Sequence, residues 1–126
     1  MKEIIFPHVS IKYIEPIVYC KYNKGVELGF PEIKELISCA ETLSNKKPCL
    51  ILSDIRSIMN ITSEGKRMLE RYTHLPFCMG TAVFVGENKY ECAQDFVSSY
   101  QPNFPFRVFN SEREAIDWLL TLSLDC

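Results

Sequence analysis

The stretch Cys49-Leu50-Ile51-Leu52-Ser53-Asp54 decides the fold class of this chain. A continuous apolar run that ends in polar residues is typical of a strand buried on both faces. Strands of this kind belong to mainly parallel sheets, whose crossover connections place helices on the sheet. We therefore expect helices and further strands to alternate on either side of this run.

The residues upstream of this strand predict an antiparallel hairpin followed by a helix. The segments His8–Tyr13 and Ile17–Tyr22 alternate at period two or are rich in β-forming residues, and Asn23-Lys24-Gly25 reads as the turn after them. The helix has Pro31 in its first turn, where a missing N–H breaks no hydrogen bond. Its apolar residues recur at steps of three and four: Phe30, Ile33, Leu36, Ile37, Ala40 and Leu43.

The alternation continues downstream. We expect a helix over Thr62–His74, a buried strand over Thr81–Val85 and a helix capped by Asn88 with Glu91. A strand over Phe106–Phe109 should follow, and then a last helix capped by Ser111. The side chains that this last helix should bury are Ala115, Trp118, Leu119 and Leu122. This order predicts one α/β domain spanning residues 1–126, with a mainly parallel sheet, an N-terminal antiparallel hairpin and about four helices.

Composition excludes several functional classes. The chain has 126 residues, with 14 Lys and Arg against 16 Asp and Glu, so no basic field points to nucleic acid. No apolar run has signal-peptide or membrane-spanning length. We therefore expect a cytoplasmic protein that neither binds nucleic acid nor inserts into a membrane.

The six cysteines show no short paired spacing, and no histidine stands near them at ligand spacing. Metal sites and redox motifs need such spacings, because one turn must present two ligands together. We expect reduced thiols that pack as small apolar side chains, with no disulfide, bound metal or cofactor.

Two stretches carry a resemblance to a known family. They are Asp54-Ile55-Arg56 with Ile61-Thr62-Ser63-Glu64, and Pro102-x-x-Pro105-x-Arg107-x-Phe109 with Ala115-x-x-Trp118-Leu119. The chain resembles the STAS-like (SpoIIAA-like) domains, named for sulfate transporters and anti-sigma-factor antagonists, and more narrowly small bacterial members of unknown function. The resemblance implies a regulatory domain without catalysis that binds proteins or small ligands.

In the anti-sigma-factor antagonists, a strand leads to an Asp-Ser-Ser-Gly turn whose second serine is phosphorylated at a helix N-terminus. Alignment of Gly65 with that glycine places Glu64, which cannot be phosphorylated, at the modified position. Thr62 and Ser63 remain as candidate phosphorylation sites.

Ligands of open α/β sheets bind at the carboxyl ends of the strands. The candidate partner-binding or regulatory residues there are Asp54, Arg56, Asn60, Thr62, Ser63 and Glu64. Structural roles compete with this interpretation, because Thr62 and Ser63 suit a helix cap and Asp54 with Arg56 suits a loop ion pair.

The sequence thus favours a non-enzymatic domain that binds another protein. Phe104, between two prolines, is a candidate partner or homodimer contact. One alternative is a small-ligand-binding protein with an apolar cleft between helices and sheet. A further alternative is an enzyme that uses Asp54 and Glu87, although no nucleophile stands beside an evident base.

Overall fold

The computed structural model describes residues 2–65, 67, 77–91, 94–95 and 105–122. A six-stranded sheet in the order β1-β2-β3-β5-β7-β8 forms its centre. The strands are β1 (Lys2–Ile5), β2 (Val9–Ile14), β3 (Ile17–Tyr22), β5 (Cys49–Asp54), β7 (Cys78–Phe84) and β8 (Phe106–Phe109). The pairs β1–β2 and β2–β3 are antiparallel, and β3, β5, β7 and β8 pair in parallel. The predicted fold class is confirmed.

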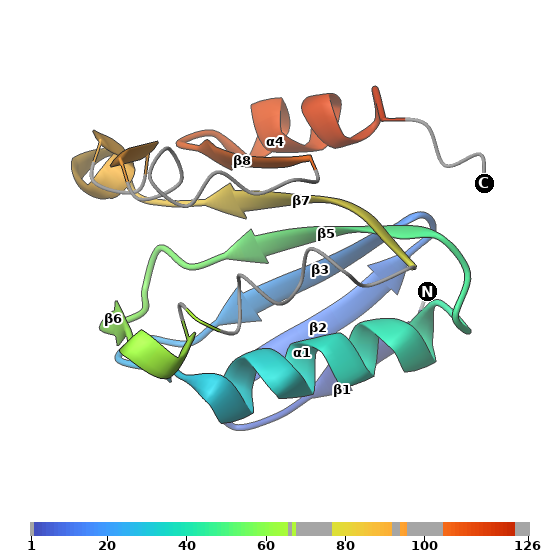
Figure 1. Ribbon diagram of the computed structural model, residues 1–126, viewed down its shortest axis with the longest axis horizontal. Helices are drawn as coiled ribbons and strands as arrows, with labels where there is room; N and C mark the ends of the chain where they lie inside the picture. The colour runs from blue at the N-terminus through green and yellow to red at the C-terminus, as the bar shows by residue number, and fades with distance from the viewer. Residues whose placement is uncertain (1, 66, 68–76, 92–93, 96–104, 123–126) are drawn as a thin grey trace.

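Two helices cover opposite faces of this sheet (Figure 1). Helix α1 (Phe30–Leu43) packs on the face that carries Cys49 and Ile51, and α4 (Glu112–Leu119) packs on the face that carries Leu50 and Leu52. Because side chains alternate across a strand, burial of the four consecutive β5 residues 49–52 requires cover on both sides of the sheet. The continuous apolar run therefore predicted this layering correctly.

A second, two-stranded sheet pairs β4 (Glu27–Leu28) with β6 (Asn60–Ile61) in parallel. It holds the start of α1 beside the helical residues 63–65 that follow β6. The Thr62 N–H donates to the Leu28 carbonyl at 2.8 Å, which continues this pairing toward the helix. Two helix starts are thereby fixed side by side.

Several expected boundaries are wrong. Three strands, β1, β4 and β6, were not expected, and β7 begins three residues earlier than expected, at Cys78, opposite Cys49. Asn88 does not cap a helix at its own position. It lies inside a 3-10 turn, η2 (Glu87–Lys89), because the Lys89 N–H donates to the Gly86 carbonyl at 2.9 Å and Gly86 is the N-cap.

The last helix is capped as predicted but is shorter than expected. The Ser111 hydroxyl accepts from the Glu114 N–H at 3.3 Å. Ala115 and Leu119 are fully buried, whereas Trp118 is only half-buried, and Leu122 lies beyond the end of α4. The Trp118 ring packs 5.6 Å from the Phe109 ring instead of in the centre of the core.

Some expectations fall outside the described residues. They are most of the helices expected over 62–74 and 88–100, and the side chains of Phe104, Cys92 and Cys126. Of the expected helices, α1 and α4 have defined bounds, so a total of about four is not established by the described part. No helix within that part is long and apolar enough to span a membrane.

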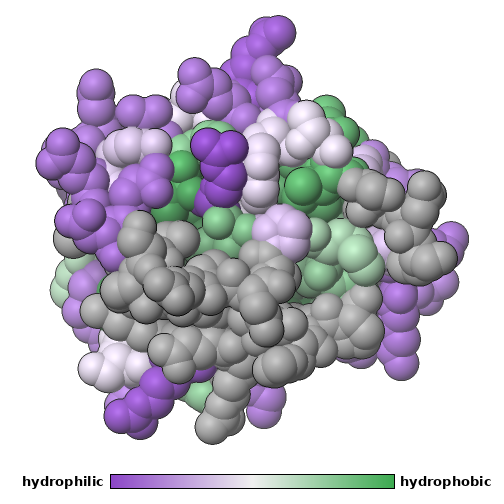
Figure 2. Space-filling model, turned by 45° about the horizontal axis from the view of Figure 1, so that its top comes forward, coloured by the Kyte–Doolittle hydropathy of each residue, from purple (hydrophilic) through white to green (hydrophobic). Residues whose placement is uncertain are grey.

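On the face that Figure 2 shows, hydrophobic side chains lie in the centre, with hydrophilic ones above them and toward the sides. The large apolar side chains exposed among the described residues are Ile5, Ile14, Phe30, Met59 and Leu120. They lie on different elements. Met59, 66% exposed, is the one in the connection that follows β5.

Candidate functional site

The carboxyl ends of the parallel strands carry the first part of the candidate site. Asp54 is the last residue of β5 and lies between Lys21 of β3 and Phe84 of β7 in the strand register. The Ile55 N–H donates to the Phe84 carbonyl at 3.0 Å, so the chain leaves the sheet along β7. The sequence-based placement of Asp54 at a strand end is confirmed.

Arg56 forms a bidentate ion pair with Asp54. Its Nε donates to Oδ1 at 3.0 Å and its Nη2 to Oδ2 at 2.8 Å, while its backbone N–H donates to Oδ1 at 3.1 Å. These bonds raise the pKa of the Arg56 guanidinium above its ordinary value. The guanidinium also lies 4.3 Å from the centroid of the Phe84 ring. Its orientation is therefore defined by both charge and stacking.

The Arg56 side chain nevertheless remains 44% exposed, against 15% for that of Asp54. In this ion pair the Asp54 carboxylate is therefore mostly buried, whereas the Arg56 guanidinium is accessible to solvent. Such geometry is more restrictive than that of an ordinary surface ion pair, because bidentate bonds and ring stacking limit the rotamers of Arg56.

The loop after Arg56 is tied to the segment before α1. The Gly25 N–H donates to the Ser57 carbonyl at 2.9 Å, and the Met59 N–H donates to the Val26 carbonyl at 2.7 Å. Ile58 between them is buried in the core on the α1 side. Ile58 thereby anchors the loop, and Met59 projects outward from it.

Lys89 supports the same loop from the other side. Its Nζ donates to the Ile58 carbonyl at 3.3 Å, although Lys89 follows β7 and the loop follows β5. Lys89 thereby joins the connections that follow two neighbouring strands, β5 and β7. Glu87 and Asn88 of the same turn are exposed.

Thr62 caps a helix, which is the structural alternative to the regulatory role that the sequence suggested for it. Its Oγ1 accepts from the Gly65 N–H at 3.0 Å, as a helix N-cap does. Thr62 is half-buried, whereas Ser63, Glu64 and Asn60 are exposed. The structure therefore separates the two candidate hydroxyls: Thr62 is occupied by the cap, and Ser63 faces the solvent.

The site gathers Asp54, Arg56 and the helix start along one connection, residues 54–64, which we call the contact turn. Both Asp54 carboxylate oxygens in this turn accept hydrogen bonds from Arg56. Sequence reasoning missed Met59, Ile58 and Phe84. The available signal was the pair of adjacent apolar residues Ile58 and Met59 in a polar loop. Such a pair predicts that one side chain is buried as an anchor for the loop and that the other is exposed.

Thiol chemistry finds no support among the four described cysteines. Burial raises the pKa of Cys20 and of Cys49 to about 12, and it also raises the pKa of Cys39 and Cys78 above the ordinary value. A thiol of raised pKa is a poor nucleophile near neutral pH. All four are free, and within the described residues no group of three or more His, Cys, Asp or Glu could hold a metal ion.

The chain has an α/β fold of the SpoIIAA-like kind. The chain is similar to the crystal structure of an uncharacterized protein of the DUF3478 family with a SpoIIAA-like fold from Shewanella loihica PV-4. The TM-score is 0.58 at 19% identity, covering 88% of this chain and 91% of that chain.

The sequence matches the family described as "Domain of unknown function (DUF7793)" over residues 10–123, and the chain belongs to that family. No curated protein matches it. The predicted resemblance to the SpoIIAA-like fold is thus confirmed.

Proposed function

We propose that this domain is a non-enzymatic regulatory domain of the cytoplasm, which binds a partner protein through the contact turn. The observation that supports this most is Arg56, an exposed cation held in one orientation by Asp54 and Phe84. A side chain that is ordered before binding loses little entropy when the partner arrives. Arginine is also enriched among the residues that dominate interface energies.

Met59 supplies the apolar contact that such an interface needs beside its charge. Its side chain is 66% exposed, yet its backbone is fixed by the hydrogen bond to Val26. Interfaces combine an apolar centre with a polar rim, and methionine adapts to irregular partner surfaces. The contact turn offers both parts within four residues of the chain.

Regulation by phosphorylation would act at Ser63 in this proposal. The Ser63 hydroxyl is exposed at the start of a helix, where backbone N–H groups and the helix dipole favour a phosphate. The same phosphate would repel the adjacent Glu64 and add negative charge to the contact turn. We therefore expect modification to change partner binding more than stability.

The test compares capture of partners from a lysate of the native cell by immobilised wild-type protein and by variants. Arg56→Ala and Met59→Asp alter the contact turn. Arg113→Ala and Leu120→Asp are matched controls on and after α4, where the Arg113 side chain is 88% exposed and Leu120 is 57% exposed. Quantitative mass spectrometry measures each retained protein.

We expect at least one protein to be retained by wild type and both controls and to fall about tenfold with each contact-turn variant. Light scattering of the purified chain shows whether that partner is a second copy. Equal retention of every protein by folded wild type and contact-turn variants would refute the proposal.

A further inference from the structure

A cleft of about 350 Å³ lies at the opposite end of the sheet from the contact turn. It is formed where β1 and the end of β2 meet the last turn of α1. The residues that line it are Lys2, Tyr13, Ile14, Glu15, Leu43, Ser44, Asn45 and Lys47. Volumes of this size fall at the lower end of the range for small-molecule sites. Unlike the apolar cleft of the alternative raised by the sequence, this one is lined by polar as well as apolar side chains.

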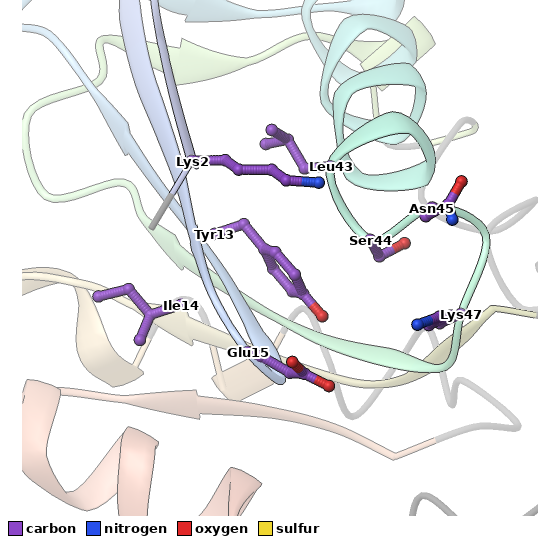
Figure 3. A pocket seen from close by; sticks show the side chains of 8 residues that line it. All are labelled: Lys2, Tyr13, Ile14, Glu15, Leu43, Ser44, Asn45 and Lys47. Carbon is purple, nitrogen blue, oxygen red and sulfur yellow. The ribbon is translucent and has the colours of Figure 1, made fainter.

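Polar groups from three separate segments converge on this cleft. In Figure 3, the Lys2 side chain extends toward the end of α1, and the Tyr13 hydroxyl points between Ser44 and Glu15. Lys47 approaches from the opposite wall. Within the described part of the chain, neither lysine has a carboxylate within ion-pair distance. The cleft is thus lined by two ammonium groups, those of Lys2 and Lys47, and by one carboxylate, that of Glu15.

The turn that carries Lys47 has an unusual backbone. Asn45 and Lys46 both adopt positive φ angles, 57° and 61°, which residues other than glycine rarely do in succession. Three hydrogen bonds maintain it: Asn45 N–H to Thr42, Lys46 N–H to Glu41 and Lys47 N–H to Ser44. The first two of these bonds form a Schellman motif, a common ending for a helix, with Asn45 in the left-handed position after the C-cap Ser44. The turn places Asn45 and Lys47 along the wall of the cleft.

We infer that this cleft binds a small anion, a carboxylate- or phosphate-bearing molecule, between Lys2 and Lys47. The Tyr13 hydroxyl donates to the same anionic group, and Glu15 accepts from an amine or hydroxyl on the rest of the ligand. Burial, followed by the charge of Glu15, raises the pKa of Tyr13, so its phenol stays protonated and able to donate. The inference is independent of the contact turn.

A structural role for the lysines would have different consequences. Helix α1 has no basic residue in its last turn, so cations near its C-terminus would favour its dipole. In that case, removal of Lys47 would lower stability and leave anion binding unchanged. Binding and stability must therefore be measured on the same variants.

The experiment is a titration of the isotope-labelled chain, followed by amide NMR at a constant ionic strength of about 0.15 M. Citrate probes carboxylates, inorganic phosphate probes phosphates, and putrescine is the cationic control. The variants are Lys2→Met, Lys47→Met and Tyr13→Phe. Lys24→Met is the matched control, because Lys24 is exposed in a turn far from the cleft in the chain. Urea denaturation measures stability in parallel.

We expect saturable shifts at Tyr13 and residues 43–47 with citrate or phosphate and none with putrescine. The tighter anion identifies the ligand group. Each of Lys2→Met and Lys47→Met should raise Kd about tenfold, and Tyr13→Phe should raise it less. If Lys47→Met does not fold, the other two variants test the same cleft. Absence of saturation with both anions, or equal weakening by Lys24→Met, would overturn the inference.

Discussion

Gly65→Ala tests the close approach that builds the contact turn. Gly65 lies in the first helical turn after Thr62, directly against β4. A Cβ at this position would stand 2.6 Å from the Leu28 carbonyl oxygen and 3.2 Å from Cγ2 of Ile61. The clash is with backbone, and that same oxygen accepts the Thr62 N–H. The added methyl can be accommodated only if the helix start moves away from β4.

Two opposing terms set the magnitude of the effect. Overpacking in a well-packed site costs about 1–3 kcal/mol. Alanine in place of glycine favours a helix by about 0.5–1 kcal/mol. The clash should prevail, because the atom it meets is part of a hydrogen-bonded backbone and cannot rotate away. We expect a net destabilisation of about 1–2 kcal/mol, equivalent to a fall in Tm of about 3–10 °C.

Urea denaturation followed by the fluorescence of Trp118 measures this difference, with the m-value checked for two-state unfolding. Gly86→Ala is the control. Its Cβ would meet only the Asn88 side chain, at 3.1 Å, and its φ of −67° is open to any residue. That variant should stay within about 0.5 kcal/mol of wild type. A Gly65→Ala protein as stable as wild type or more so would show that helix and β4 are not in such contact.

Three further predictions concern the core and the turn after α1. Burial raises the pKa of the Cys20 thiol to about 12, so an unfolded thiol loses its proton first and the free energy of unfolding should fall above about pH 9. Urea denaturation measured from pH 8 to about 10.5 gives the free energy of unfolding at each pH. This free energy should fall less steeply with pH for Cys20→Ala than for wild type, by about 1.4 kcal/mol per pH unit. Equal slopes for the two proteins would contradict the prediction. Trp118→Ala should cost about 2 kcal/mol in urea denaturation, because the ring is half-buried, against about 3–5 kcal/mol for full burial; a midpoint equal to wild type would place the ring in solvent. Lys46→Gly should stabilise by about 1 kcal/mol, since glycine adopts positive φ without strain; a lower Tm in calorimetry would argue against that strain.

Periodicity and caps were sufficient for the layers of this fold. The run at Cys49–Asp54 predicted two-sided burial, the three- and four-residue steps predicted α1, and Ser111 predicted the start of α4. Each of these signals is local, because it depends on residues within one element. Such signals are strongest where a single element is long or clearly bounded.

Elements fixed by pairing could not be found in this way. Strand β1 has two charged residues in four, and β4 and β6 have two residues each, which is too short for a pattern. Their conformation depends on partners distant in the sequence. Trp118 illustrates the same limit within a helix: it follows the apolar spacing, but α4 is turned so that Ala115 and Leu119 face the sheet.

The residues of the candidate site also differ in how far the sequence could predict their arrangement. Asp54 and Arg56, two residues apart, were foreseeable as a strand end and an ion pair, whereas the stacking of Arg56 on Phe84 requires the β5–β7 pairing. The cleft joins residues 2, 13–15 and 43–47, which no local pattern connects. Sites assembled from several elements become visible only in the folded chain.

The contact turn and the cleft should behave as independent sites. Helix α1 begins beside the contact turn and ends at the cleft, and its 14 residues span about 21 Å. That separation exceeds the screening length of about 8 Å at physiological ionic strength, so loss of the Lys47 charge should not reach Arg56 through solvent. We expect Lys47→Met to leave partner capture unchanged, Arg56→Ala to leave anion binding unchanged, and the double variant to show the sum of the two effects. Affinities of all three variants for citrate or phosphate and for the captured partner provide the test. Non-additivity beyond about 0.5 kcal/mol would show that α1 couples its two ends, and the sites would then have to be treated as one system.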